Sequence, residues 1–278
     1  MDKFLTDVHN HSKFSHDGVS KLSDMLQTAQ EKGVAFYGVS EHFDYDICAD
    51  SQKDEPQGID EESYFHAARH LQEDYAGVMN VLVGAEMGFS ENKDVQGRYA
   101  LTYEKYLPDF VVNSVHSFRG WDYCSQKAFY TEKRALRAKK EVYEEYFTLV
   151  EKSLDAPYPY DIIGHFGYVS RYFPIEEREI VYAEFSEKID DVLRKIIQKD
   201  KILEVNASAY GLRQISIPAR DVLQRYFQLG GRKISYASDA HQTKSILRGR
   251  AEIVAMLKEI GFTHFTVPCR GEHIRVEF

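Results

Sequence analysis

The sequence is short of several features that would each indicate a particular class of protein. No apolar run reaches about 18 residues, which excludes a membrane-spanning helix. Only three cysteines occur, Cys48, Cys124 and Cys269, and they form no Cys-x-x-Cys pair, so we predict neither a disulfide framework nor a structural zinc knuckle. The first seven residues are charged and lack the apolar segment of a secretory signal. We therefore expect a cytoplasmic protein with reduced thiols.

Positive charge is also scarce relative to negative charge. The chain has 35 Lys and Arg against 44 Asp and Glu, a formal net charge of −9 at pH 7. An acidic chain has no electrostatic reason to bind nucleic acid or anionic lipid, so we expect neither as a partner. The oligomeric state is left open by the sequence.

What the chain does contain is enough apolar material for a large core. Hydrophobic residues make up 43% of the 278 residues and aromatic residues 13%. Short apolar runs alternate with longer amphipathic segments, a pattern typical of an α/β fold. The length would allow two domains, but an α/β barrel routinely uses about 250 residues as one domain. We predict a single domain spanning residues 1–278.

The short apolar runs predict strands and the amphipathic segments predict helices. Seven strands are expected, at Phe4–His9, Ala35–Ser40, Asn80–Glu86, Asp109–His116, Asp161–His165, Ile202–Asn206 and Ile234–Asp239. Helices are expected near residues 22–29, 67–75, 131–152, 183–199, 218–229 and 247–260, with a short final strand at His264–Val267.

Several of these strands are continuous apolar runs rather than alternating ones. Val81-Leu82-Val83 and Phe110-Val111-Val112 are examples. Such runs suit strands of a parallel sheet that is covered on both faces. Strands of this kind alternating with helices imply either a (β/α) barrel or a doubly wound open sheet.

Histidines and carboxylates stand at the ends of the predicted strands. In a parallel barrel the carboxyl ends of all strands lie on one face, so residues far apart in the sequence can meet there. Imidazole and carboxylate donors without cysteine suit Zn, Mn or Fe. Nine potential ligands exceed the roughly four or five that one ion needs, and they suit two or three divalent ions about 3.5–4 Å apart. The predicted metal ligands are His9, His11, Asp17, His42, Glu86, His116, His165, Asp239 and His241.

Three other histidines are possible metal ligands by residue type. His16 adjoins Asp17 and is the alternative ligand in the first loop, although Asp17 is preferred. His66 and His70 lie four residues apart on a predicted helix and are interpreted as part of its solvated face.

With these residues in place, the sequence resembles the PHP (polymerase and histidinol phosphatase) metallohydrolase family nearly from end to end. The matching stretches are Asp7-Val8-His9-Asn10-His11, Ser15-His16-Asp17-Gly18, Ser40-Glu41-His42, Gly84-Ala85-Glu86, Ser114-Val115-His116, Gly164-His165 and Ser238-Asp239-Ala240-His241. The resemblance implies a distorted (β/α)7 TIM-like barrel with a trinuclear metal centre. Within the family, the branch that the sequence resembles implies hydrolysis of L-histidinol phosphate to L-histidinol and phosphate, a step of histidine biosynthesis.

The resemblance also implies how the ligands are shared. One ion would take His9, His11, Glu86 and Asp239. A second would share Glu86 and add His116 and His165. The third would take Asp17, His42 and His241.

Phosphate monoester hydrolysis needs a hydroxide nucleophile, neutralisation of the phosphoryl oxygens and a proton for the leaving alkoxide. We expect direct in-line attack by metal-bound hydroxide, with Glu86 bridging two ions and with Asp17, His241 or a metal-bound water as the general acid. Arg171 and Arg213 follow the fifth and sixth predicted strands, and their guanidinium groups match phosphate geometry. Ser117, directly after His116, is a weaker candidate for the same role.

Four other functions compete with this one. The alternative nearest to it is a PHP phosphoesterase that acts on another small phosphate ester, such as a nucleotide or a sugar phosphate. An exonuclease module is disfavoured by the acidic charge. An amidohydrolase is disfavoured because the fourth predicted strand ends without a lysine. A metal-dependent binding domain without catalysis is disfavoured by the intact ligand set.

Overall fold

The computed structural model describes residues 4–48, 58–210 and 215–278. Seven strands form one parallel sheet in the order β1-β2-β3-β4-β7-β8-β9, and all seven predicted strands are confirmed. Their bounds are β1 Leu5–Asp7, β2 Val34–Phe43, β3 Asn80–Gly88, β4 Phe110–Ser114, β7 Ile162–Ile163, β8 Ile202–Asn206 and β9 Ile234–Ala237.

The first and last strands of this sheet meet, so the sheet is nearly closed. The backbone N–H of Val8 donates to the carbonyl of Tyr236 at 3.2 Å, and that of Asp239 donates to the carbonyl of His9 at 3.1 Å. Side chains reinforce the seam, since Asp7 Oδ1 accepts from the Ser238 N–H at 2.8 Å. The choice between barrel and open sheet is therefore settled in favour of the distorted (β/α)7 TIM-like barrel.

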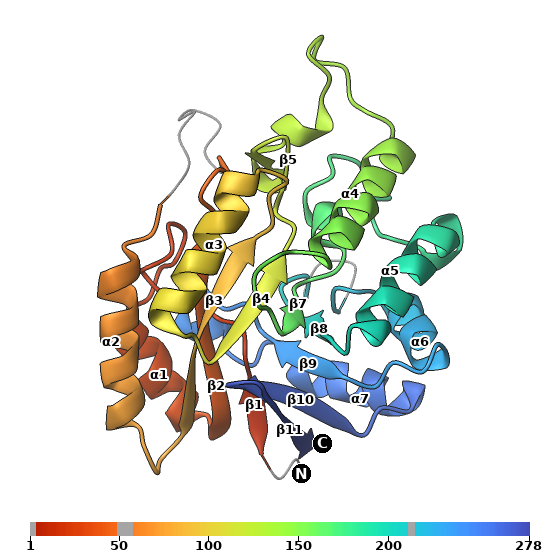
Figure 1. Cartoon of the computed structure of the whole chain (residues 1–278). Helices are drawn as coiled ribbons and strands as arrows, with labels where there is room; N and C mark the ends of the chain where they lie inside the picture. The colour runs from red at the N-terminus through yellow and green to blue at the C-terminus, as the bar shows by residue number, and fades with distance from the viewer. Residues whose placement is uncertain (1–3, 49–57, 211–214) are drawn as a thin grey trace.

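Seven helices surround the barrel (Figure 1), in the part of the chain that is described. The longest has 15 residues, and none combines the length and the apolarity needed to cross a membrane. Their bounds are α1 Leu22–Glu31, α2 Glu61–Asp74, α3 Lys93–Tyr106, α4 Lys139–Ser153, α5 Ser186–Gln198, α6 Arg220–Gln228 and α7 Arg250–Ile260.

Three helices differ from the prediction. Helix α2 begins at Glu61, six residues before the expected range of 67–75, where the Asp60 side chain caps it by accepting from the Ser63 N–H. The helix expected from Thr131 begins only at Lys139, because residues 130–136 form a turn in which the Thr131 N–H donates to the Ala135 carbonyl at 2.9 Å and Arg134 adopts a φ of 58°. Helix α3 was not predicted. It carries Gly97 in its interior and buries only three side chains, so its apolar stripe is thin.

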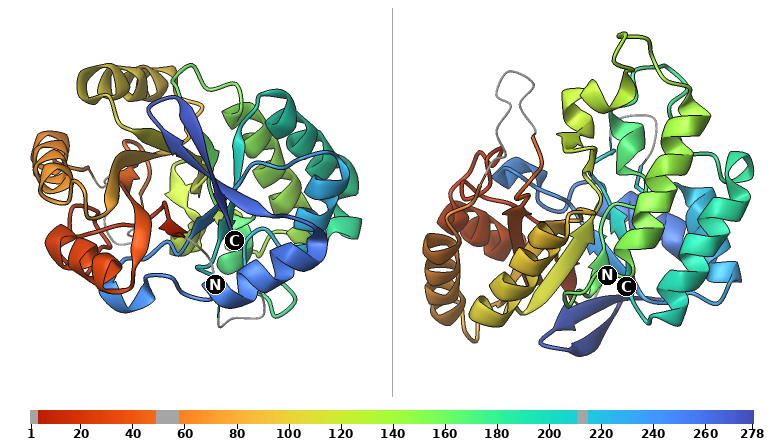
Figure 2. Two further views of the ribbon diagram at one scale, coloured as in Figure 1. Left: turned by 90° about the horizontal axis from the view of Figure 1, so that it is seen from below. Right: turned by 45° about the horizontal axis from the view of Figure 1, so that its top comes forward.

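The C-terminal strand prediction is confirmed and extended, but this strand does not join the barrel. β10 (His264–Cys269) pairs antiparallel with β11 (Glu272–Glu277), and the view from below shows this hairpin crossing the bottom of the barrel (Figure 2). Its Val267 and Val276 belong to one buried cluster with Val8, Leu82, Phe110, Val112, Ile162 and Ile202 from the barrel strands. The amino-terminal end of the barrel is thus sealed by apolar packing.

A second, short hairpin projects at the opposite end. β5 (Ser117–Phe118) pairs with β6 (Trp121–Asp122) directly after His116. Positive φ angles at Arg119 (52°) and Gly120 (79°) make the tight turn between them. This hairpin stands beside the carboxyl ends of the strands, where the candidate site lies.

Candidate metal centre

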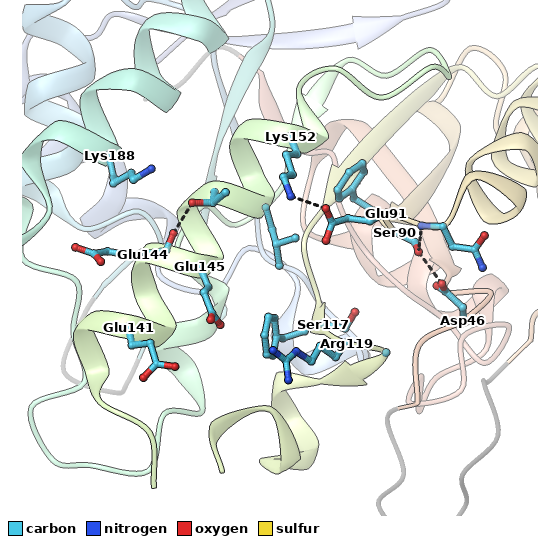
Figure 3. Close-up of a pocket in the computed structure, with 16 residues that line it drawn as sticks. Asp46, Ser90, Glu91, Ser117, Arg119, Glu141, Glu144, Glu145, Lys152 and Lys188 are labelled. Atoms are coloured by element: carbon cyan, nitrogen blue, oxygen red, sulfur yellow. Dashed lines mark hydrogen bonds and ion pairs between the residues drawn. The ribbon is translucent and has the colours of Figure 1, made fainter. Parts of the chain in front are cut away.

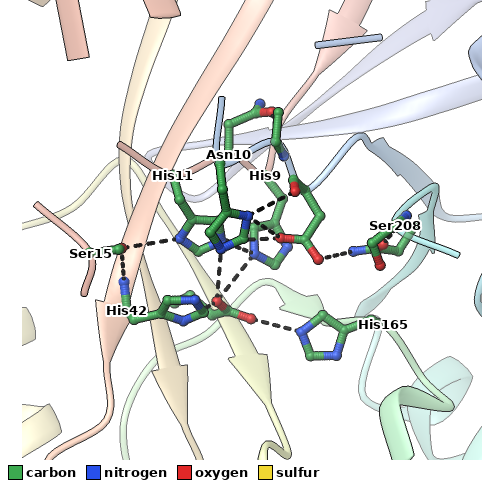
Figure 4. A network of polar contacts seen from close by, with 12 residues as sticks. His9, Asn10, His11, Ser15, His42, His165 and Ser208 are labelled. Atoms are coloured by element: carbon green, nitrogen blue, oxygen red, sulfur yellow. Dashed lines mark hydrogen bonds and ion pairs between the residues drawn. The ribbon is translucent and has the colours of Figure 1, made fainter. Parts of the chain in front are cut away.

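All nine predicted ligands gather at the carboxyl ends of the barrel strands (Figure 4 shows part of the cluster). The convergence follows from parallel topology, because every β-strand of the barrel ends on the same face. His9 and His11 follow β1, Asp17 lies before α1, His42 and Glu86 lie in β2 and β3, His116 and His165 follow β4 and β7, and Asp239 and His241 follow β9.

Glu86 lies at the centre of the cluster and is fully buried. Its Oε1 is 3.0 Å from His116 Nε2 and 2.9 Å from His165 Nε2. Its Oε2 is 2.8 Å from His42 Nδ1 and 3.3 Å from His9 Nε2. The two oxygens of one carboxylate therefore face two separate groups of imidazoles.

The remaining residues extend the cluster towards the opening of the barrel. Asp239 Oδ1 is 3.3 Å from His11 Nε2, and Asp17 Oδ2 is 3.0 Å from His241 Nε2. Asp17 Oδ1 also lies 3.6 Å from His42 Nε2. Asp17 thus contacts two other predicted ligands, whereas the neighbouring His16 contributes a ring 5.5 Å from that of His42. The geometry favours Asp17 over His16 as a ligand in the first loop.

The donor atoms fit divalent cations. Three triplets have donor atoms within 4.8 Å of one another, namely His9–His11–Glu86, His42–Glu86–His116 and His11–His42–His241. Zn–N distances of about 2.0–2.1 Å place tetrahedral ligand atoms about 3.3 Å apart, which matches these separations. Within the described residues, His42 Nδ1 and Glu86 Oε2 are buried without a hydrogen bond although they approach to 2.8 Å. Cations held by this cluster would provide partners for such atoms.

Without a cation, the predicted ligands shift one another's pKa values in different directions. Burial would lower the pKa of His42, but Glu86 and Asp17 outweigh it and raise that pKa to about 10. Burial, together with His42 and His241, holds the pKa of His11 well below its usual range. Burial would raise the pKa of Glu86, but His9, His116 and His42 hold it well below its usual value. The carboxylates therefore hold protons on imidazoles that a cation would displace, so we expect cation binding to release protons.

Comparison with known proteins shows the family of the chain. The profile of the PHP domain matches residues 7–208. The chain belongs to the PHP domain family. Seven of the nine predicted ligands lie inside the matched residues, and Asp239 and His241 follow them.

Two curated relatives span most of the chain. A protein of Clostridium acetobutylicum named as a probable histidinol-phosphatase is 28% identical over 240 residues, which cover 86% of this chain and 88% of that protein. The histidinol-phosphatase of Lactococcus lactis is 26% identical over 261 residues, covering 92% of this chain and 91% of that protein.

A solved structure has the same fold as this PHP chain. The crystal structure of histidinol phosphate phosphatase from Lactococcus lactis, complexed with zinc, L-histidinol and phosphate, superposes with a TM-score of 0.81 at 23% identity, covering 97% of this chain and 98% of that one. The likeness confirms the PHP-type barrel.

Three buried carboxylates near the PHP cluster were missed by the sequence reasoning. Glu204 in β8 faces His9, with Oε1 2.6 Å from Nδ1. Asp44 Oδ1 lies 3.1 Å from His116 Nδ1. Glu41 accepts hydrogen bonds from the hydroxyls of Ser12 and Ser15, both at 2.6 Å, and so fixes the loop that carries Asp17. For Glu204, the sequence did contain a signal: a charged residue inside an otherwise apolar strand indicates a buried functional carboxylate.

Arg171 lies beside the PHP cluster, in the short 3₁₀ helix Tyr168–Arg171 that follows β7. Its Nη1 is 3.6 Å from Asp239 Oδ2, and its guanidinium packs over the rings of Tyr168 and Tyr172. Arg213, the second predicted phosphate contact, lies outside the described residues.

Ser117, the third predicted contact, lies in the wall of a different cavity. This cavity, of about 760 Å³, is bordered by the loop after β3, the β5 hairpin and α4 (Figure 3), and none of the nine predicted ligands lines it. Successive side chains of an extended chain point to opposite sides, so Ser117 faces away from the direction of His116. Its position gives the prediction for Ser117 no support.

Proposed function

We propose that this PHP protein is a metal-dependent phosphomonoesterase that hydrolyses L-histidinol phosphate to L-histidinol and phosphate. The observation that carries the proposal is the nine-donor cluster at the open end of the barrel, in a chain whose relatives of similar length are named as a histidinol-phosphatase and a probable histidinol-phosphatase. The proposal treats residues 1–278 as one functional domain.

Two to three divalent ions would be held by the nine donors. One ion would take His9, His11, Glu86 and Asp239, a second Glu86, His116 and His165, and a third Asp17, His42 and His241. The nitrogen and oxygen donors accept Zn²⁺, Mn²⁺ or Fe²⁺. When bound, such ions lower the pKa of a water molecule towards 7 and neutralise charge on the phosphoryl oxygens.

The side chains around the cluster would orient the substrate. Arg171 is held by Asp239 and by the tyrosine rings in a fixed position, so its guanidinium is ready to bind phosphate oxygens without much loss of side-chain entropy. Arg213 is proposed as a second phosphate contact because it follows β8 in the sequence. An acidic chain needs such cationic groups to hold a phosphate dianion.

The proton for the leaving alkoxide would come from the outer part of the cluster. Asp17 and His241 contact each other at 3.0 Å, and their side chains are 45% and 24% exposed, whereas Glu86 is fully buried. The exposed side of this pair faces solvent, where the alcohol product must be released. We therefore propose that, in the form with two ions bound and the third set of donors free of a cation, Asp17 and His241 share the proton that passes to the leaving group.

The test is elemental analysis of the purified protein combined with phosphate release from a panel of esters. The panel contains L-histidinol phosphate, a nucleoside monophosphate, a sugar phosphate and p-nitrophenyl phosphate. We expect bound divalent metal and a kcat/KM for L-histidinol phosphate at least about 100-fold above the others, or about 2.7 kcal/mol of transition-state discrimination. Preference for the nucleotide or the sugar phosphate would support the alternative phosphoesterase instead.

A further inference from the structure

Strand β8 is the one described barrel strand that supplies none of the nine predicted ligands. It nevertheless carries a fully buried carboxylate, Glu204, and a buried amide, Asn206, both on the side of the cluster. We propose that Glu204 is a positioning residue of the metal centre, which holds His9 with its proton on Nδ1 and so presents Nε2 to the cation. This inference rests on the proposed function as far as the presence of metal is concerned.

Glu204 accepts hydrogen bonds from three donors. Two of them belong to predicted ligands, and the third, Asn206, also contacts a predicted ligand. Its Oε1 lies 2.6 Å from His9 Nδ1. Its Oε2 accepts from the backbone N–H of His165 at 2.7 Å and from Asn206 Nδ2 at 2.9 Å. Asn206 Nδ2 in turn lies 3.3 Å from Asp239 Oδ2. One carboxylate therefore ties together the positions of ligands that follow β1, β7 and β9.

The contact with Glu204 determines which nitrogen of His9 can bind a cation. A neutral imidazole has one N–H donor and one acceptor nitrogen, and an ionised carboxylate only accepts. The proton of His9 must therefore lie on Nδ1, which leaves the lone pair on Nε2. That Nε2 is 3.0 Å from His11 Nε2 and 3.3 Å from Glu86 Oε2, so it points to the donors with which it would share an ion.

Three other imidazoles have a more distant partner, or none, at the corresponding nitrogen. His116 Nδ1 lies 3.1 Å from Asp44 Oδ1, and His11 Nδ1 lies 3.3 Å from the neutral hydroxyl of Ser15. His165 Nδ1 is buried with no hydrogen-bond partner among the residues placed in the structure. Among these contacts, that between His9 and Glu204 is the shortest, and both of its side chains are completely buried. We expect His9 to be the imidazole most dependent on its partner.

Only a carboxylate can satisfy this arrangement. Three donors converge on two oxygens, and both oxygens must accept. Glutamine has nearly the same volume but offers one acceptor oxygen and one NH₂ group. In Glu204→Gln, either His9 Nδ1–H or the pair His165 N–H and Asn206 Nδ2 would face another donor. The substitution therefore disturbs the hydrogen bonds while leaving the packing volume unchanged.

The experiment measures zinc affinity and the tautomer of His9 in the full-length protein. Zinc affinity is measured by competition with a chromophoric chelator. The His9 tautomer is measured by ¹H–¹⁵N spectra of zinc-loaded protein with ¹⁵N-labelled histidine, assigned by the signal lost in His9→Gln. We expect wild-type His9 to carry its proton on Nδ1. We expect Glu204→Gln to bind zinc about 10- to 100-fold more weakly.

The matched control is Asp109→Asn at the other end of the barrel. Asp109 is also a fully buried carboxylate, and it accepts from Arg69, Gln72 and the backbone N–H of Val83. This substitution should lower stability without changing zinc affinity. If Glu204→Gln behaves like the control, with lower stability and unchanged zinc affinity, the positioning role is refuted.

The wild-type spectrum keeps the inference testable even if Glu204→Gln fails to fold. A proton on Nε2 of His9 in the zinc-loaded wild type would overturn it without any variant. Failure of the proposed function gives a different result. The wild type would then bind zinc and show the Nδ1–H tautomer, yet release no phosphate from L-histidinol phosphate.

Discussion

Replacing Glu86 by glutamine is the most direct perturbation of the cluster. Oε1 of Glu86 faces His116 and His165 at 3.0 and 2.9 Å, and Oε2 faces His42 at 2.8 Å. The amide of Glu86→Gln keeps one oxygen and replaces the other by NH₂, which cannot donate a lone pair to a cation. One of the two imidazole groups must therefore lose its carboxylate donor, and both lose its negative charge.

The magnitude follows from the position of Glu86. Removing partners that only orient a ligand typically weakens metal binding by 10- to 100-fold. Removing a donor that faces both groups should exceed this, with a loss of at least about 100-fold, or about 2.7 kcal/mol, in affinity for one cation. Loss of a divalent cation removes several kcal/mol of transition-state charge stabilisation, so turnover should fall by about 10³-fold or more. The metal-free variant should stay folded, because glutamine fills the same volume.

The assay combines metal content after dialysis into metal-buffered solution, phosphate release at the same buffered concentration of free Zn²⁺, and circular dichroism. We expect Glu86→Gln to retain its secondary structure with less than the wild-type metal content and almost no turnover. A folded variant with full metal content and wild-type turnover would refute the assignment of Glu86 as the shared ligand. Unfolding of the variant in the metal-free state would show instead that Glu86 acts through stability.

Three further predictions concern phosphate binding, stability and metal dependence. Arg171→Ala should raise KM for a phosphate ester by about 10- to 100-fold in steady-state assays, because it removes one charge-assisted hydrogen bond to phosphate. Arg171→Lys should recover part of this loss. An unchanged KM would place the phosphate elsewhere. Asp109→Asn should lower the free energy of unfolding by about 2–3 kcal/mol, less than the 3–5 kcal/mol of a sealed buried pair because the Arg69 and Arg270 side chains are 28% and 67% exposed and can regain water. Burial would raise the pKa of Asp109, but Arg270, the Val83 N–H and Arg69 hold that pKa below its usual value. The stabilisation by Asp109 is therefore present above about pH 4 and is lost as the pH falls through the folded-state pKa. In denaturant titrations across this range, the free energy of unfolding of the variant should change less with pH than that of the wild type. Dialysis against a chelator should abolish phosphate release and added Zn²⁺ or Mn²⁺ should restore it, whereas full activity of demetallated protein would contradict the metal role.

Much of the barrel could be predicted from the sequence because local signals and topology agree. Apolar runs such as Phe110-Val111-Val112 are long enough to be strands and too short to be buried helices. His116 and His165 each follow such a run by a few residues, so parallel topology alone brings them together. Closure of the barrel was not predictable from periodicity, since it depends on hydrogen bonds between the His9 and Asp239 backbones, which are more than 200 residues apart.

The errors have equally local causes. Helix α3 was missed because Gly97 and a stripe of only Val95, Tyr99 and Thr102 give a weak helical pattern. The start predicted for α4 was too early because the basic residues before Lys139 were included in the helix, whereas residues 130–136 form a turn. Helix propensity read from the sequence is therefore a weak guide where tertiary contacts and local backbone hydrogen bonds determine the conformation.

The partners of the ligands were harder to predict than the ligands themselves. Glu204 stands in the middle of a strand, and nothing within its own segment indicates that it faces His9, which is 195 residues earlier in the chain. Asp44 lies two residues after His42 yet contacts His116. Which carboxylate orients which imidazole is determined by the side-by-side placement of strands, and that placement is visible only in three dimensions.

The β10–β11 hairpin covers the amino-terminal end of the barrel, opposite the predicted metal ligands, with Val267 and Val276 packed against the barrel strands. Under the proposed function, substrate and products would exchange at the carboxyl ends of the strands, where Asp17 and His241 are partly exposed. An ester whose phosphate lies against the cluster enters phosphate first, so the alcohol is the outer product and departs before the phosphate beneath it. Inorganic phosphate should then compete directly with the substrate, while the free alcohol should not, and measurements of product inhibition would distinguish the two.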